Sequence, residues 1–141
     1  MRMPIWILFA LLAAVFAALV AIFGKIGISG VDSTLATTVR AVIMAVFLVI
    51  VALSLGKWQL ISTINGKLLL FIALSGIAGA LSWLFYFVAL KTGPASGVAA
   101  LDRLSVVFVV IFATLFLAEK LSWKLALGAG FITLGALFMV L

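Results

Sequence analysis

Residues that could do chemistry are few in this chain, and they lie between long apolar stretches. Cysteine and histidine are absent, which excludes disulfides, thiolate or imidazole metal sites, cysteine nucleophiles and Ser-His-Asp triads. The acidic residues are Asp32, Asp102 and Glu119, so little acid–base chemistry is available. We therefore expect no catalytic residues, no metal site and no cofactor, and most enzyme classes are disfavoured.

The composition points to a lipid environment. Apolar residues make up 69% of the 141 residues and charged residues 9%, whereas a soluble domain has roughly 45–50% and about 25%. Too few charged side chains remain to cover a surface that faces water. The net charge of +6 comes from basic residues between the apolar runs, where they indicate membrane-edge anchors and not nucleic-acid binding.

Five apolar runs have the length of a transmembrane helix, which is roughly 20 residues. They cover about 4–23, 34–55, 68–90, 97–118 and 125–141. We expect Asp32, Ser33 or Thr34 to cap the second helix, Asn65-Gly66 to form a turn before the third, and Pro94 to follow its end. The first run is longer than the apolar core of a signal peptide, so we expect a retained helix. The predicted fold is an all-α membrane protein of five transmembrane helices with short loops, in a single domain, 1–141.

The third run carries the most informative stripe of side chains. Ser75, Gly79, Ser82 and Tyr86 follow one another at helical spacing on one face, with Trp83 beside them. Hydroxyls, a glycine and two amphipathic aromatic rings on one face are typical of a cavity wall, so these residues are substrate-cavity candidates. The alternative is that the serines bond to neighbouring helices and the aromatic rings pack in a core.

The first run has a face of small residues. Its members are Ala10, Ala14, Ala17, Ala21 and Gly24. Small faces let helix backbones approach closely in lipid, so the face predicts helix packing. The alternative is that the small side chains leave room for a substrate, which adds Ala14 and Ala17 to the cavity candidates.

Asp102 lies about five residues into the fourth run, roughly 8 Å from its start. A carboxylate there needs water or a basic partner, and we expect Lys25, Arg40 and Lys91 on the same side as charge-pair candidates. Arg103 is expected to point to another part of the helix surface, and Arg40 is able to snorkel outward. Asp102 is then either half of a structural ion pair or a group that binds a substrate amine or a proton. No run has an acid at its centre, so strong proton coupling is not supported.

The basic residues show almost no bias between the two sides of the membrane. One side has Arg2, Lys57, Lys67, Lys120 and Lys124, and the other has Lys25, Arg40, Lys91 and Arg103. A positive-inside bias would fix one orientation, and its absence predicts insertion in both. An odd number of spans with dual topology suits an antiparallel homodimer. The alternative is that some bases snorkel and do not contribute, with the N-terminus in the cytoplasm.

From Leu81 onward the motifs occur in a familiar order. They are Ala89-Leu90, Gly93-Pro94-Ala95-Ser96, Leu117 with Glu119, Leu127-Gly128 and Leu134-Gly135. With Lys25 and Arg40 in place before them, the whole chain resembles the EamA family of the drug/metabolite transporter superfamily.

This resemblance implies a half-size member of a family whose members mostly have two inverted halves of five spans. It implies a pair, either an antiparallel homodimer or a complex with a related half, in lipid of a prokaryotic plasma (inner) membrane. It further implies export or exchange of small metabolites or amphipathic drug-like compounds through a central cavity, to which Asp102 and Ser105 would contribute. Many members have a proline near the position of Ser105, and this chain lacks it. The first-span glutamate of small multidrug transporters is also missing, so their proton-antiport mechanism does not carry over.

Two other functions remain open. The chain could be a non-transporting accessory or assembly subunit of another membrane complex. It could also be a membrane enzyme for lipid-linked substrates, for which only the pairs Asp102–Arg103 and Glu119–Lys120 offer acid–base groups.

Overall fold

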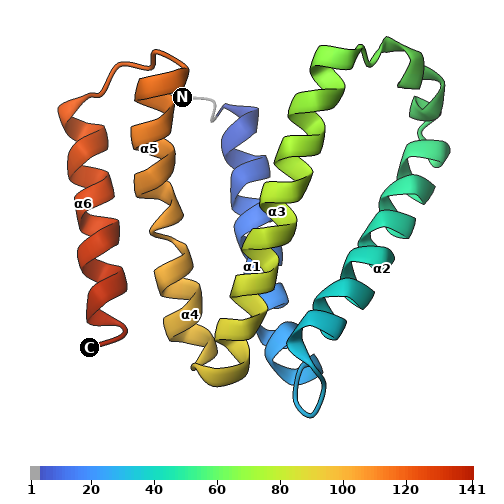
Figure 1. Ribbon diagram of the computed structural model, residues 1–141. Helices are drawn as coiled ribbons and strands as arrows, with labels where there is room; N and C mark the ends of the chain where they lie inside the picture. The colour runs from blue at the N-terminus through green and yellow to red at the C-terminus, as the bar shows by residue number, and fades with distance from the viewer. Residues whose placement is uncertain (1–3) are drawn as a thin grey trace. The chain divides into compact units, whose positions relative to one another are not determined.

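The computed structural model describes residues 4–141, and all regular structure in them is helical (Figure 1). The elements are α1 (Ile5–Gly27), α2 (Ser33–Ser54), the 3₁₀ helix η1 (Lys57–Thr63), α3 (Gly66–Thr92), α4 (Ala95–Asp102), α5 (Ser105–Phe116) and α6 (Trp123–Phe138). The all-α prediction is confirmed. Arg2 lies outside the described residues.

The described chain divides into two compact units. The first unit holds the described residues up to Lys25 together with Thr92–Leu141, and the second holds Ile26–Lys91. The candidate residues are therefore distributed over both units.

Within residues 4–141, four helical stretches are long and apolar enough to cross a membrane. They are α1, α2, α3 and the stretch Ala95–Phe116 formed by α4 and α5. At 16 residues, α6 is about 24 Å long, shorter than a hydrocarbon core of roughly 30 Å. The chain is thus a multi-pass helical protein with four long apolar stretches and one shorter apolar helix. At most 6% of the most apolar window of each long stretch is buried, so these helices present their apolar side chains outward, as lipid-facing helices do.

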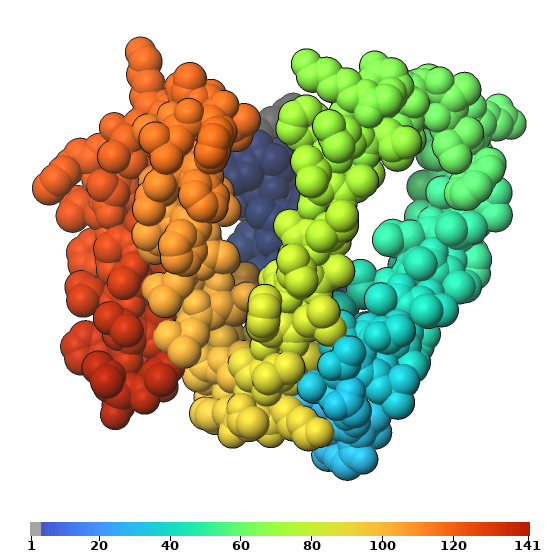
Figure 2. Space-filling view, in the orientation of Figure 1, coloured from blue at the N-terminus to red at the C-terminus, as the bar shows by residue number. Residues whose placement is uncertain are grey.

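In the first unit, α6 packs along both α4 and α5, and the space-filling view shows the contact with α5 (Figure 2). Gly97 in α4 is buried because this packing is close. A Cβ atom at Gly97 would lie 3.3 Å from Pro94 Cγ and 3.7 Å from Val140 Cγ2. A side chain there would press on Pro94, whereas its contact with Val140 would have an ordinary van der Waals distance.

The predicted fourth span is not one continuous helix. α4 ends at Asp102 and α5 begins at Ser105. Across the junction, the Leu104 N–H donates to Leu101 O at 2.9 Å and the Val107 N–H to Leu104 O at 2.9 Å, which is the 3₁₀ pattern. The break forms without a proline. The backbone tightens locally into 3₁₀ hydrogen bonding, and the apolar pattern of the span does not predict this change.

In the second unit α2 begins one residue before its predicted run and α3 begins two residues before its own, so Gly66 is the first residue of α3 and not part of the predicted turn. The Asp32 carboxylate accepts hydrogen bonds from the N–H groups of Thr34 and Leu35 at 2.9 and 3.0 Å, so it caps α2 as predicted. Asn65 Oδ1 accepts from the Leu68 N–H at 3.0 Å at the start of α3. The connection between these helices contains η1, which follows Gly56 at a φ of 65°. This short helix was not predicted from the sequence.

One end of the α2–α3 pair is held by a lysine. Lys91 Nζ donates to Val31 O at 3.0 Å and so ties the end of α3 to the loop before α2. From this end the two helices spread toward η1, and the space-filling view leaves open space between their side chains (Figures 1 and 2). We call the Lys91–Val31 contact the latch.

Candidate substrate-binding site

Three aromatic rings form a cluster on α3. The centroids of Trp83 and Tyr86 lie 5.4 Å apart at an interplanar angle of 75°, and those of Trp83 and Phe87 lie 5.9 Å apart at 64°. Such edge-to-face pairs stabilise beyond the area that they bury. Phe87 is buried, whereas Trp83 and Tyr86 are half-buried. The cluster therefore has a fixed base and two rings with accessible edges.

Arg40 of α2 lies on this cluster. Its Cζ atom is 3.7 Å from the centroid of the Trp83 ring and 5.6 Å from that of Phe87. A guanidinium at this distance is attracted by the negative face of the ring. We call the set Arg40, Trp83, Tyr86 and Phe87 the arginine–aromatic cluster.

Sequence reasoning missed this contact, although a signal for it exists. Arg40 follows the cap Asp32 by eight residues, and Trp83 precedes the latch residue Lys91 by eight. At 1.5 Å per residue, both lie about 12 Å from the end where α2 and α3 meet. Because the latch joins α2 and α3 at this end, the equal spacing of eight residues places Arg40 and Trp83 at the same depth along the two helices.

The serines among the predicted cavity residues differ from the threonines within the long helices. Thr37 and Thr114 donate to the carbonyls four residues earlier, both at 2.8 Å. The hydroxyls of Ser75, Ser82 and Ser105 have no hydrogen-bond partner among residues 4–141. They are therefore available to an external group, which matters because an unmatched hydroxyl is costly in lipid.

Gly79 lies between the two serines on α3 and leaves open space. A Cβ atom built at Gly79 meets nothing within 4 Å among the described residues. Ser75 and Ser82 are exposed. The stripe predicted from the sequence is thus an accessible face of α3 that ends at the aromatic cluster.

Asp102 has a different partner from those expected. Its Oδ2 atom lies 3.7 Å from Arg103 Nη2, and the two side chains are 36% and 52% exposed. The expectation that Arg103 points elsewhere is wrong, because its guanidinium reaches the carboxylate of the adjacent Asp102. A half-exposed pair of this kind contributes little to stability.

Lys25 and Lys91 both hold loop carbonyls. In the first unit Lys25 Nζ donates to Gly93 O at 2.8 Å, and in the second unit Lys91 Nζ donates to Val31 O. The pKa of Asp32 lies below its ordinary value, chiefly because the Leu35 N–H bonds its carboxylate, with help from Thr34 and the charge of Lys91. These interactions place charge at the ends of the helices, where water is available.

The candidates on α1 lie on one helix, as expected. Ala14 is exposed, Ala17 is half-buried and Ala21 is buried. Ala14, Ala17, Asp102 and Ser105 belong to the first unit, whereas the α3 stripe belongs to the second.

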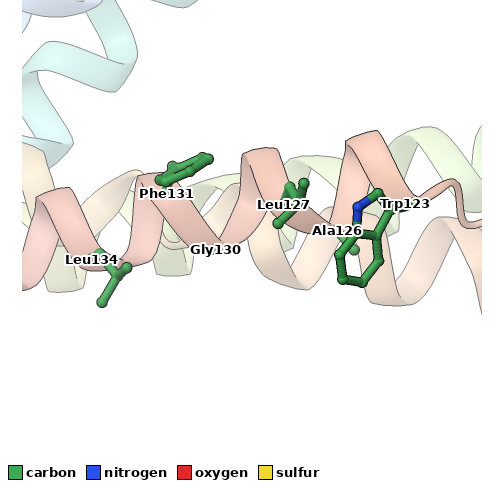
Figure 3. Close-up of a pocket in the computed structure, with 6 residues that line it drawn as sticks. All are labelled: Trp123, Ala126, Leu127, Gly130, Phe131 and Leu134. Atoms are coloured by element: carbon green, nitrogen blue, oxygen red, sulfur yellow. The ribbon is translucent and has the colours of Figure 1, made fainter.

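A depression of about 220 Å³ lies on α6, and its lining contains none of the candidate residues. Its lining consists of Trp123, Ala126, Leu127, Gly130, Phe131 and Leu134, all from one helix (Figure 3). Because the lining is apolar and open to one side, it is a surface for packing and not a polar binding site. Among residues 4–141 no group of three acidic, histidine or cysteine side chains is placed to hold a metal ion.

Comparison with known proteins gives the family. A curated protein from Sinorhizobium sp., named "Uncharacterized transporter in cobO 3'region", is 48% identical over 134 residues, which cover 95% of this chain and 95% of that protein. No solved structure matches the chain. Residues 4–141 match the EamA-like transporter family, and we conclude that this integral, multi-pass membrane protein belongs to that family of transporters.

Proposed function

We propose that the chain is half of an exporter or exchanger of small amphipathic metabolites or drug-like compounds. Two copies in antiparallel orientation would enclose a central cavity in a prokaryotic plasma membrane, with α6 as the fifth span of each. The observation that carries the proposal is the accessible face of α3, where unpartnered hydroxyls lie next to two aromatic rings. Cavities that bind small molecules combine apolar walls with a few well-placed polar groups in this way.

Each candidate residue has a role in this proposal. Trp83 and Tyr86 stack on the apolar part of the substrate, and Ser75 and Ser82 hydrogen-bond its polar part. Gly79 leaves the space between them. From the first unit, the small side chains of Ala14 and Ala17 give room, and Asp102 and Ser105 add polar groups to the cavity.

Pairing of two halves is supported by what the helices leave uncovered. The four long stretches bury almost none of their apolar windows within one chain. The Sinorhizobium relative is matched over 95% of its own length, so it too has the length of one half. A second, inverted copy would complete a repeat of the kind found in secondary transporters.

The break between α4 and α5 supports alternating access. Discontinuous helices line the binding sites of many transporters, and a 3₁₀ junction is a natural point of bending. In this proposal α4 and α5 move about Arg103 and Leu104 while α3 holds the substrate.

Transport is tested by comparing metabolites outside and inside cells that express Trp83→Ala or the control Phe85→Ala. Phe85 is on the same helix and 72% exposed, so its loss removes an aromatic ring away from the cluster. Cells with the unaltered chain are expected to redistribute a defined set of small molecules, measured by mass spectrometry. Trp83→Ala should reduce this flux roughly five- to thirtyfold at equal abundance in the membrane, since stacking contacts of this kind contribute about 1–2 kcal/mol.

The accessory-subunit alternative gives a different pattern. It predicts no flux from the unaltered chain, and a change in the abundance or assembly of another membrane protein in the Trp83→Ala strain. That pattern would reject the transporter.

A further inference from the structure

In the arginine–aromatic cluster, the positive charge of Arg40 has no anionic partner among the described residues, and the proposed function gives this charge no role. A guanidinium has five N–H donors. Among residues 4–141 the contacts of Arg40 are with the Trp83 and Phe87 rings, and no carboxylate or carbonyl accepts its hydrogen bonds. Ring faces attract the positive charge but do not accept hydrogen bonds in the plane of the guanidinium. The donors of Arg40 are therefore open to a ligand.

The second unit offers no acid for this charge. Asp32 is the one acidic residue among Ile26–Lys91. Its carboxylate caps α2 through the N–H groups of Thr34 and Leu35, about 12 Å along the helix from Arg40. An oxyanion for Arg40 must therefore come from outside this unit.

We propose that Arg40 binds the carboxylate of the transported substrate, and that the substrate carries this carboxylate next to an apolar or aromatic group. The inference builds on the proposed function, because it assigns the charged part of the substrate to a residue that lies on Trp83. Stacking on Trp83 fixes the plane of the guanidinium, and a fixed planar fork matches the two oxygens of a carboxylate. The rings of Trp83 and Tyr86 then receive the apolar part.

A lipid phosphate has similar chemistry, but the position of Arg40 favours a substrate. Its Cα lies about 12 Å inside α2 from the capped end, whereas lipid phosphates lie outside the hydrocarbon core. The contact with Trp83 at the same depth holds the guanidinium inward. A freely snorkelling arginine would not keep this contact.

The test is ligand binding to the full chain in dodecyl maltoside micelles, which carry no charged group. The probes are benzoate and benzamide, two flat molecules of similar shape of which only benzoate is an anion. Saturation-transfer NMR measures the affinity of each for the unaltered chain, for Arg40→Gln and Arg40→Lys, and for the control Lys67→Gln. Lys67 lies in the first turn of α3 and its replacement removes the same charge.

We expect benzoate to bind the unaltered chain roughly tenfold more tightly than benzamide, because the carboxylate forms a charge-assisted, bidentate pair. Arg40→Gln should abolish this difference and Lys67→Gln should keep it. Arg40→Lys should keep part of it, since an ammonium is charged but not planar.

Several results would overturn the inference. Equal affinities of the two probes for the unaltered chain would do so, whether or not any variant folds. If Arg40→Gln and Lys67→Gln weakened benzoate binding equally, the preference for benzoate would be due to the net charge of the protein and not to Arg40. Displacement of benzoate by stoichiometric phosphatidylglycerol would identify a lipid headgroup as the ligand. Flux without a preference for benzoate would reject this inference alone, whereas benzoate binding without flux would reject only the transporter.

Discussion

Asp32 and Lys91 show how single side chains of this protein place charge where water is available. Asp32 satisfies two N–H groups at the start of α2, and Lys91 satisfies a carbonyl of the preceding loop. Neither charge has to enter the apolar stretch. Arg40 differs, because it carries its charge into the helix pair and rests it on aromatic rings.

Asp32 gives a prediction with a defined pH dependence. Because its pKa is lower in the folded protein than its ordinary value of 3.8, the carboxylate stabilises the fold above that value. This stabilisation is lost as the pH falls through the lower, folded pKa. At neutral pH, Asp32→Ala should lower the apparent Tm by roughly 2–4 °C, whereas Asp32→Asn, which keeps the capping oxygen, should lower it less.

Thermal unfolding in detergent at pH 6 and at pH 3 checks this prediction. The difference in Tm between the unaltered chain and Asp32→Asn should narrow at the lower pH, because the Asp32 carboxylate is then partly protonated and resembles the neutral asparagine. An undiminished gap would mean that the charge of Asp32 is not what stabilises the start of α2.

The junction between α4 and α5 is the element that separates this chain from a simple helical bundle. Its i→i+3 hydrogen bonds have poorer geometry than those of an α-helix. We expect the amides of Leu104–Val107 to exchange with deuterium at least about tenfold faster than those of Val110–Phe112, as local opening there is less costly. Mass spectrometry with residue-level fragmentation measures this, and equal protection would show that α4 and α5 act as one rigid helix.

Local signals in the sequence predicted more of this structure than long-range ones. The cap at Asp32, the start of α3 after Asn65 and its end before Pro94 depend on a few neighbouring residues, so they were predictable. The α4–α5 break has no proline to announce it, and the Asp102–Arg103 pair depends on side-chain conformations that the sequence does not specify. The Arg40–Trp83 contact joins two helices, so its prediction needed the latch at Lys91.

For the whole protein, the orientation of the chain in the membrane is testable by thiol labelling at two exposed positions on either side of α2. Ser29 lies before α2 and Lys57 lies after it, and both are exposed. The native chain has no cysteine, so Ser29→Cys and Lys57→Cys each give a single thiol. In intact cells, an impermeant thiol reagent should label about half of each variant if the chain inserts in both orientations, as balanced charges predict.

A fixed orientation would give a different outcome. One variant would be labelled nearly completely and the other hardly at all, and the antiparallel homodimer would be rejected in favour of a related half with the opposite orientation. Phe47→Cys, in the middle of α2, serves as a control that should stay unlabelled in both cases.

The latch between Lys91 and Val31 fixes one end of α2, so any tilt of this helix moves its other end the most. With 22 residues, α2 is about 33 Å long, so a tilt of about 5° at the latch displaces its far end, and η1 with it, by about 3 Å. Arg40 lies about 12 Å from the latch, so the same tilt displaces it only about a third as far as the far end of α2. Arg40, close to the fixed end of α2, therefore stays near a bound ligand while the end of α2 at η1 moves. A gate requires this combination of a fixed binding group and a mobile far end.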